Sequence, residues 1–434
     1  MSGRLSKTVV GSLFVLLATH SASAVEVATA DFTYTPPTCS AGPFTDVGSG
    51  HPACAWIQRL AADQISTGCG GGKYCPDGAV TRAQLAVILE KALRGTANWD
   101  LSKGMWSRTR VVPIVPGNQV ASGARLLATI VSIDDSSVNN VYHVLLEGGT
   151  YDLDGAQLVL PEGLVLEGIG RNRTKIRTAR SGAAVVGGFS ELHSLEVGNF
   201  LPGASVHGVD APVTLKDVTV RASGAVTVGI YCDELCALDD VFVDAGATST
   251  ATGVYLHDEA FDHFKNVQIS ASAGSIAYGL RLDGLAAGEV LGGDIEARSG
   301  DTLVVAVQVD SANSAFLPLL LRNVTAEATS INGPTIIAGL RVLHGDTVVE
   351  NSRISGDGNA SSDDYGVLCE EDYTQIHNSR IIGDDHTLRA DTGCTLRAAA
   401  SQLYGGATFE NGGAIRCVAD YSEAFGSNGL EVCF

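Results

Sequence analysis

The sequence predicts a mainly β protein whose larger part is a right-handed parallel β-helix, preceded by a small α-helical module. Two repeated segments carry this prediction. One begins as "LKDVTVRA", "LDDVFVDA" and "FKNVQISA" and recurs seven times between Val213 and Gly383, with starts 23 to 30 residues apart. The other, with copies such as "GIYCDE", "GVYLHD" and "GLRLDG", falls between them. Self-similarity at this period indicates a repeat architecture.

Both segments alternate apolar with polar side chains and are rich in β-branched residues, which is typical of strands. The gaps between them contain Gly, Asp, Asn and Ser, and none is long enough for a crossover helix. Coils of about 25 residues would therefore stack at the inter-strand spacing of ~4.8 Å. We expect these side chains to face inward: Val218, Val220, Val241, Val243, Val267 and Ile269.

An Asp or Asn occupies the third position of most copies of the first segment: Asp217, Asp240, Asn266, Asn323, Asn351 and Asn378. Stacked coils would align these side chains at a turn, where Asn can form a hydrogen-bonded ladder. Gly292–Gly293 interrupts this column. The pattern resembles the pectin-lyase-like superfamily of right-handed parallel β-helices. The resemblance concerns architecture and implies no particular activity.

The chain has 434 residues, 51 of them glycine, and a formal net charge of −20 at pH 7. This length allows two or three domains. The acidic balance argues against nucleic acid as a partner and is compatible with cations or basic surfaces. The alternative is that acidic turns simply keep an exported protein soluble.

Residues 1–24 have the features of a signal peptide. Arg4 and Lys7 precede a short apolar run, and Ala22-Ser23-Ala24 fits a small-x-small cleavage site. The run is too short to cross a bilayer, and no later stretch is a transmembrane candidate. We expect export to the cell surface, the extracellular space or the periplasm.

The ten cysteines all follow that site, as expected for a disulfide framework in an exported chain. Sequence does not define their connectivity. The hypothesis is local pairing: Cys39–Cys54, Cys69–Cys75, Cys232–Cys236, Cys369–Cys394 and Cys417–Cys433. No Cys/His cluster has zinc-site spacing, so we expect neither a metal nor another cofactor.

A helical module is predicted at residues 44–95, after a linker at 25–43. One helix is expected from Ala53 to Gln64. A second helix begins at Thr81, where Thr81 and Gln84 form a capping box, and ends near Gly95.

This module resembles a single S-layer homology (SLH) domain through "FTDV", a Trp-containing first helix, "ISTG" and "TRAQ". The family binds cell-wall polysaccharide, usually through three copies. The resemblance implies glycan contacts from Asp46, Trp56, Gly68 and Arg82. This chain has one copy, and Gln84 replaces the usual acid. The alternative is a small helical module held together by Cys69–Cys75.

The remainder is predicted to be a linker at 96–123 and a β-helix at 124–434. An apolar helical pattern from Ala124 to Ile133 is expected to cap the open end of the solenoid, where unpaired strand edges would invite aggregation. "GGTYDL" and "LEGIGRNRTKI" read as first coils beginning near Tyr142, and they resemble the opening of many secreted β-helix proteins.

The second repeated segment predicts two columns of outward side chains, because alternate residues of a strand share a face. One contains Tyr231, Tyr255, Arg281, Gln308, Arg341 and Leu368. The other contains Asp233, His257, Asp283, Asp310, Leu343 and Glu370. Aromatic rings, carboxylates and guanidinium groups on one face suit a saccharide, and Arg suits a uronate.

Three interpretations of this face remain open. It is the ordinary polar side of a sheet, a glycan-binding surface, or a catalytic site. Catalysis would use Asp283 and Asp310 as an acid/base pair, flanked by His257 and Arg281. None of the specific motifs of β-helix glycosidases or lyases is present. The leading hypothesis is therefore a non-catalytic structural or polysaccharide-binding protein, and the alternative is a polysaccharide hydrolase or lyase. The glycan and the oligomeric state stay open.

Overall fold

In the computed structural model the chain forms two compact units, residues 1–108 and 109–434. The structure describes residues 27–29, 32–34, 38–39, 44–94, 108–258, 261–299, 301–311, 318–330, 336–358 and 363–419. The predicted signal peptide and Cys433 lie outside these residues. None of the described helices is long and apolar enough to cross a membrane.

The first unit contains a short antiparallel strand pair, β1 (Val27–Thr29) and β2 (Phe32–Tyr34), and two helices, α1 (Cys54–Ala62) and α2 (Arg82–Arg94). Its small core consists of Val47, Cys54 and Ile57. The predicted capping box is confirmed: the Thr81 amide donates to Gln84 Oε1 (2.8 Å), and the Gln84 amide donates to Thr81 Oγ1 (3.2 Å).

The second unit begins with β3 (Thr109–Val112) and α3 (Gln119–Val131). The strands of its first coils are β4 (Tyr142–Leu146), β5 (Gly149–Asp152), β6 (Leu158–Val159), β7 (Leu164–Glu167), β8 (Thr174–Thr178), β9 (Gly182–Val186), β10 (Ser190–Phe200), β11 (Ser205–Asp210) and β12 (Val213–Cys232). The middle coils contain β13 (Cys236–Asp239), β14 (Phe242–Leu256), β15 (Phe261–Ala273), β16 (Ile276–Gly284), β17 (Ala287–Ser299), β18 (Leu303–Ser311), β19 (Leu319–Thr329) and β20 (Ile336–His344). The last coils contain β21 (Thr347–Glu350), β22 (Arg353–Asp357), β23 (Asp363–Cys369), β24 (Asp372–His377), β25 (Arg380–Asp391), β26 (Cys394–Ala399), β27 (Gln402–Asn411) and β28 (Ala414–Val418).

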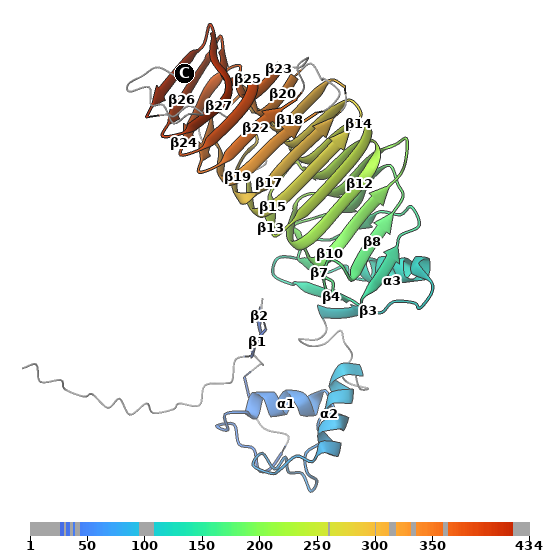
Figure 1. Cartoon of the computed structure of the whole chain (residues 1–434). Coiled ribbons are helices and arrows are strands. Elements are labelled where there is room, and N and C mark those ends of the chain that lie inside the picture. Colours follow the sequence, from blue (N-terminus) through green and yellow to red (C-terminus); the bar gives the residue numbers. More distant parts are fainter. Residues whose placement is uncertain are drawn as a thin grey trace, which may run out of the picture. The chain divides into compact units, whose positions relative to one another are not determined.

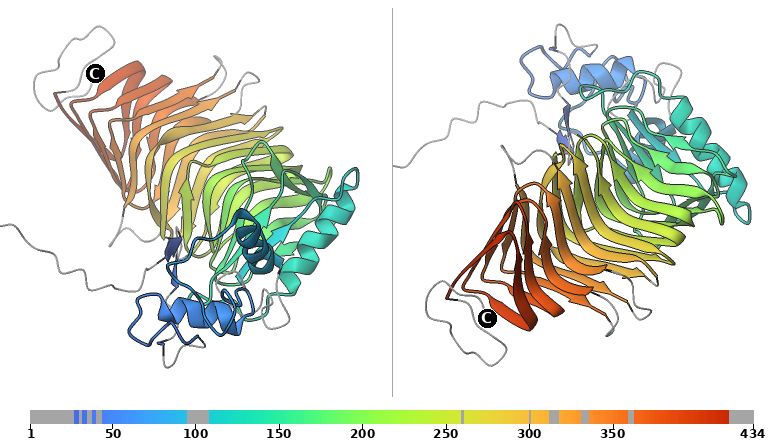
Figure 2. Two further views of the ribbon diagram at one scale, coloured as in Figure 1. Left: turned by 90° about the horizontal axis from the view of Figure 1, so that it is seen from below. Right: turned by 90° about the horizontal axis from the view of Figure 1, so that it is seen from above.

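These strands form a parallel β-helix, as the sequence predicts (Figure 1). Each coil contributes one segment to each of three parallel stacks, and a long strand such as β12 runs through all three of them. For example, Leu215 pairs with Leu238, Val220 with Val243, and Tyr231 with Tyr255. Figure 2 shows the stacked strands from two further directions. The six side chains expected to face inward are all buried, with at most 2% of each exposed.

A left-handed backbone corner joins the first stack to the second. The repeated Asp and Asn residues occupy it, with φ between 49° and 60° from Asp217 to Asn378. Asp and Asn tolerate this region better than most side chains. Gly292 takes the same position with φ 78°, so it continues the column that it was expected to interrupt. Hydrogen bonds between these side chains are absent from the described residues. The backbone conformation, and not a side-chain ladder, thus accounts for the repeat.

Helix α3 covers the N-terminal end of the solenoid, as expected for a cap. Leu126 and Ile130 are buried in the main core, and the Asn118 side chain accepts a hydrogen bond from the Ala121 amide at the helix start. The helix begins earlier than predicted, at Gln119, and β3 already pairs with β4. Residues 109–123 thus belong to the solenoid and not to the expected linker.

Four of the five predicted disulfides are confirmed: Cys39–Cys54, Cys69–Cys75, Cys232–Cys236 and Cys369–Cys394. Cys232–Cys236 closes the turn between β12 and β13, and Cys369–Cys394 joins β23 to β26. The Cys417–Cys433 pair stays a prediction. Several disulfides in one chain indicate an oxidising, extracytoplasmic compartment.

Candidate functional site

Strand register on the third stack brings the six residues of the first predicted column into one row. Tyr231 pairs with Tyr255, Tyr255 with Arg281, Arg281 with Gln308, Gln308 with Arg341, and Arg341 with Leu368. These neighbours lie one strand apart, which corresponds to about 4.8 Å. The column therefore places aromatic and guanidinium groups side by side, although they are far apart in the sequence.

The second column is confirmed in part. Asp283 lies beside Asp310, but a register shift after Val309 pairs Asp310 with His344 and not with Leu343. The shift changes which residue occupies the outward position, because successive side chains of a strand alternate between faces. Leu343 was thus the wrong member of this column.

Five residues of these columns form one network, which we call the lateral cluster: Tyr231, Tyr255, His257, Arg281 and Asp283. The Asp283 carboxylate accepts a hydrogen bond from the Tyr255 hydroxyl and pairs closely with His257 Nδ1. Arg281 Nη2 lies 3.4 Å from the same carboxylate. Only 16% of the Asp283 side chain is exposed. The carboxylate is thus held by Arg281 of its own strand β16, by Tyr255 of the neighbouring strand β14 and by His257 just beyond the end of β14.

The aromatic rings of the lateral cluster pack against one another. The rings of Tyr231 and Tyr255 meet edge to face, with centroids 5.4 Å apart, and the His257 ring lies 5.5 Å from Tyr255. The Arg281 guanidinium lies 4.9 Å from the Tyr255 ring and 5.2 Å from the Tyr278 ring. Cation–π packing of this kind orients the guanidinium plane. The cluster is consequently preorganised without a ligand.

Asp283 changes the acid–base properties of its neighbours. Its hydrogen bond to His257 is the largest effect on that imidazole and raises the pKa above the ordinary value, while desolvation opposes it. Burial, followed by the hydrogen bond to Asp283, raises the pKa of Tyr255. His257 therefore retains its proton to higher pH than a free histidine, and the Tyr255 hydroxyl stays protonated.

The sequence missed a neighbouring pair, His207 and Asp210. His207 Nδ1 lies 2.8 Å from Asp210 Oδ1, and its ring centroid lies 5.6 Å from that of Tyr231. Asp210 pairs with Tyr231 in register and so belongs to the same column. A signal existed, since "SVHGVD" from Ser205 has the same alternation one coil before "GIYCDE".

The column is not a continuous exposed strip. Only 3% of Gln308 is exposed, and its Oε1 has no hydrogen-bond partner within the described part of the chain. Leu368 is buried in a second apolar cluster, with Tyr278, Val305, Ala338 and Tyr365. Arg341 pairs with Glu370 at 2.8 Å. The aromatic groups of this column that remain partly exposed thus lie in the lateral cluster and next to His207.

Asp283 and Asp310 lie in register but in different environments. Asp310 Oδ1 lies 2.7 Å from His344 Nδ1, whereas Asp283 belongs to the lateral cluster. Each carboxylate thus has its own histidine partner, His257 for Asp283 and His344 for Asp310. This arrangement differs from two carboxylates that share a site and one proton.

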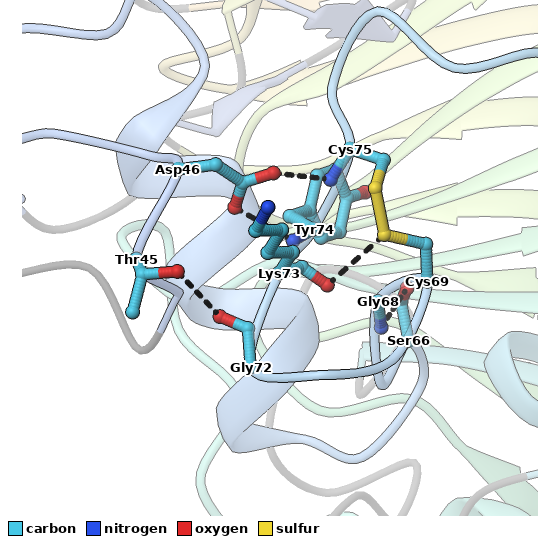
Figure 3. Close-up of a disulfide and its surroundings, with 9 residues drawn as sticks. All are labelled: Thr45, Asp46, Ser66, Gly68, Cys69, Gly72, Lys73, Tyr74 and Cys75. Atoms are coloured by element: carbon cyan, nitrogen blue, oxygen red, sulfur yellow. Dashed lines mark hydrogen bonds between the residues drawn. A yellow bond between two sulfur atoms is a disulfide. The ribbon is translucent and has the colours of Figure 1, made fainter.

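The four SLH-like candidates occupy different environments in the first unit. Asp46 accepts hydrogen bonds from the amides of Tyr74 and Cys75, both at 2.8 Å (Figure 3). These bonds, with that from Tyr74 first, lower the pKa of Asp46. At Gly68 φ is 76°, and a Cβ would collide with the Lys73 carbonyl. Asp46 and Gly68 therefore stabilise the loop that Cys69–Cys75 closes.

A groove of about 520 Å³ lies between this loop and α2. Gly68 lines it together with Tyr74, Val87 and Lys91, whereas Asp46, Trp56 and Arg82 do not. Of the four candidate residues, only Gly68 thus lines this groove. Among the described residues, no group of three His, Cys, Asp or Glu side chains could hold a metal ion.

Comparisons with known proteins show only distant structural similarity. No family model and no curated protein matches the chain. The A-module of the mannuronan C-5 epimerase AlgE6 of Azotobacter vinelandii is 15% identical, with a TM-score of 0.38 over 69% of this chain and 89% of that one. The catalytic domain of a GH87 α-1,3-glucanase is 11% identical, with a TM-score of 0.39 over 74% of this chain and 67% of that one. Pectin methylesterase PemA from Erwinia chrysanthemi is 13% identical, with a TM-score of 0.35 over 70% of this chain and 89% of that one. Likeness at this level carries no argument about activity.

Proposed function

We propose that the protein is an exported polysaccharide-binding protein whose β-helix contacts saccharide at the lateral cluster. One observation carries the proposal: two tyrosine rings, a guanidinium and a carboxylate–imidazole pair lie on adjacent strands of one face. Tyr231 and Tyr255 provide ring faces and edges for pyranose stacking. Arg281 provides charge-assisted hydrogen bonds for a uronate carboxylate.

The packing of the cluster supports binding over a purely solvated face. An ordinary polar sheet surface contains isolated ion pairs with little energetic weight. Here the pairs around Asp283 are mostly buried and are fixed by aromatic contacts. Binding groups that are rigid before the ligand arrives lose less conformational entropy when it binds.

A second candidate, a polysaccharide lyase or hydrolase, is favoured by the Tyr255–Asp283–His257 hydrogen-bond chain. In this proposal His257 is the acid/base group, Asp283 orients it, and Arg281 neutralises the substrate carboxylate. An imidazole that is hydrogen-bonded to a carboxylate suits such proton transfer. The separate environments of Asp283 and Asp310 favour this arrangement over a carboxylate pair.

The test is binding and turnover with polygalacturonate, alginate and neutral glucans. Replacing Tyr231 and Tyr255 together by Ala should weaken binding of acidic and neutral chains alike. Arg281→Gln should affect mainly acidic chains, and mainly at low salt, since salt screens charge. Tyr373→Ala is the matched control, because Tyr373 is a half-buried tyrosine of another stack. If the double variant binds every glycan like the parent, the binding proposal fails.

Turnover separates the two candidates. Reducing ends report hydrolysis, and ultraviolet absorbance of unsaturated product reports elimination. Activity that His257→Ala abolishes, and that the Tyr373 control leaves intact, would replace the non-catalytic proposal with the enzymatic one.

We also propose cell-wall attachment through the SLH-like unit, supported by its motifs and by the groove beside α2. Arg82→Ala, at an exposed position, tests this role. Unchanged retention of the variant on wall material would remove Arg82 from the contact. Equal retention of a fragment that begins at residue 96 would remove the whole unit.

A further inference from the structure

A second surface of the solenoid has the chemistry of an anion site. It is a groove of about 530 Å³ along the left-handed corner of the last coils, which we call the corner groove. Residues of four successive coils line it, including Asn323, Asn351, Asn378, Arg353 and Arg380. The three Asn side chains are exposed.

Two arginines of the corner groove lie on neighbouring strands. Arg353 of β22 pairs in register with Arg380 of β25, and both are exposed. Neither guanidinium has an ion pair or hydrogen bond to another described residue. The Arg380 guanidinium lies 5.2 Å from the Tyr404 ring, which orients it and leaves its N–H groups available.

Such a pair is costly in the free protein, because like charges directly opposite each other on adjacent strands repel. Carboxylates are abundant in this chain of net charge −20, yet none in the part of the chain that the structure describes offsets the pair. Glu350 precedes the same corner but is held by Arg322, with Oε2 2.8 Å from Nε. A bound anion would offset the repulsion.

The floor of the corner groove is rigid. Buried Ser352, Ser379 and Ser401 form a ladder in which each hydroxyl accepts from an amide one coil earlier, at 3.1 to 3.2 Å. Each hydroxyl also donates to a carbonyl two residues before it, at 2.7 to 3.0 Å. The serine hydroxyls of the ladder already have hydrogen-bond partners within the protein. The groups that face a ligand are therefore the Arg and Asn side chains.

Charge changes sign along the same register column. Asp294 pairs with Thr325, Thr325 pairs with Arg353, and Arg380 pairs with Gln402. The acid therefore lies two strands before the first arginine, and the cationic part is limited to the final coils. An anionic ligand would be directed to this end of the column by the field of its side chains.

We propose that the corner groove binds an anionic polysaccharide. Arg353 and Arg380 contact carboxylate or sulfate groups, and the amides of Asn351 and Asn378 bond to sugar hydroxyls. The groove favours a chain over a small anion because its polar groups continue through four coils. It lies on a different corner of the coil from the lateral cluster, so either proposal can fail alone.

The experiment uses the whole protein and four probes: polygalacturonate, dextran sulfate, neutral dextran and single-stranded oligothymidylate. Affinity electrophoresis at low salt compares the parent with a double variant, Arg353→Gln with Arg380→Gln. Its matched control is Arg397→Gln with Arg416→Gln, which removes a second register-paired set of arginines that does not line the groove. We expect the groove variant to lose about tenfold or more in affinity for acidic polysaccharide, since each lost contact is charge-assisted. The control should lose less than about threefold.

Several results would overturn the proposal. They are an equal loss in both variants, no loss in the groove variant, or oligothymidylate binding as tight as that of the acidic polysaccharides. Competition by inorganic sulfate at polymer-like affinity would also do so, by assigning the site to a small anion. Circular dichroism of the groove variant checks folding. If the double variant Tyr231→Ala with Tyr255→Ala still binds acidic polysaccharide and the groove variant does not, the corner groove accounts for the affinity.

Discussion

The lateral cluster and the corner groove are built by the same stacking of parallel strands, but they treat charge differently. In the cluster the Asp283 carboxylate is bonded to Tyr255, His257 and Arg281, so its negative charge is offset by its neighbours. In the groove Arg353 and Arg380 lie side by side with no carboxylate partner among the described residues.

This difference separates two ways to make a binding surface. The cluster is stabilised internally, so a ligand must compete with contacts that already exist, and its geometry is fixed in advance. In the groove the two arginines repel each other, and a bound anion would reduce this repulsion. Substitutions of charged residues should therefore reduce the stability of the fold in the cluster and leave it unchanged or higher in the groove.

The largest effect is expected at the centre of the cluster. Asp283→Asn removes a charge that pairs with Arg281 and His257. The Arg281 guanidinium would then lie in a half-buried site without this counter-charge, while His257 keeps the Asp258 carboxylate 3.1 Å from its Nε2. We expect a loss of about 2–3 kcal/mol in the free energy of unfolding, measured by denaturant titration. Asp310→Asn is the control, because 36% of that side chain is exposed and its partner His344 is 52% exposed. It should cost less than about 1 kcal/mol. Equal losses would show that the cluster is no more than a surface network.

A smaller effect is expected at the corner that shapes the groove. Asn351 has φ 49°, a conformation that a β-branched residue adopts poorly. Asn351→Val should cost about 1–2 kcal/mol, while Asn351→Gly should change stability by no more than roughly 0.5 kcal/mol. Thermal or urea unfolding of the two variants measures this. A valine variant as stable as the glycine variant would mean that the corner does not require the left-handed backbone.

The sequence predicted the parallel β-helix, the capping helix and the first column because all three depend on periodicity. "GIYCDE" and its copies keep one alternation from coil to coil, which is why Tyr231, Tyr255 and Arg281 were placed in register correctly. The shift between Val309 and Asp310 was not predicted, since a bulge adds a residue without disturbing the local hydrophobic pattern.

The burial of outward side chains could also not be predicted from the sequence. Gln308 lies between Arg281 and Arg341 in the strand register, and its burial is a property of the assembled surface and not of its own segment. The corner arginines had a signal, because "SRISG" and "SRIIG" place them at equal positions of successive copies. Their lack of partners could not be predicted, since it depends on where every carboxylate points.

A third effect depends on pH and sharpens the view of the cluster as internally paired. The pKa of His257 is raised in the folded protein, chiefly by Asp283. Its stabilising contribution is therefore fully present below the unfolded pKa of about 6.5 and is lost as pH rises through the folded value. Nuclear magnetic resonance titration of the His257 ring should show the raised pKa in the parent and a lower one in Asp283→Asn. An unchanged His257 titration in that variant would contradict the assigned cause.

The smallest effect should be a loss of stability for one arginine in the column of the lateral cluster and a gain of stability for one arginine of the corner groove. Arg341, in the same column as Arg281, is 17% exposed and pairs with Glu370 at 2.8 Å, so Arg341→Gln leaves a carboxylate without its cation and should destabilise the fold by about 1 kcal/mol. Arg353→Gln breaks no ion pair with any residue that the structure describes and relieves repulsion with Arg380, so it should stabilise the fold by about 0.2–0.5 kcal/mol at low salt. High salt should remove the gain at Arg353, because it screens exposed charges, and should reduce the loss at Arg341 less. Urea unfolding at two salt concentrations measures both. A loss at Arg353 equal to that at Arg341 would mean that the groove arginines are paired like the rest, and the case for an anionic ligand at the corner would lose its electrostatic basis.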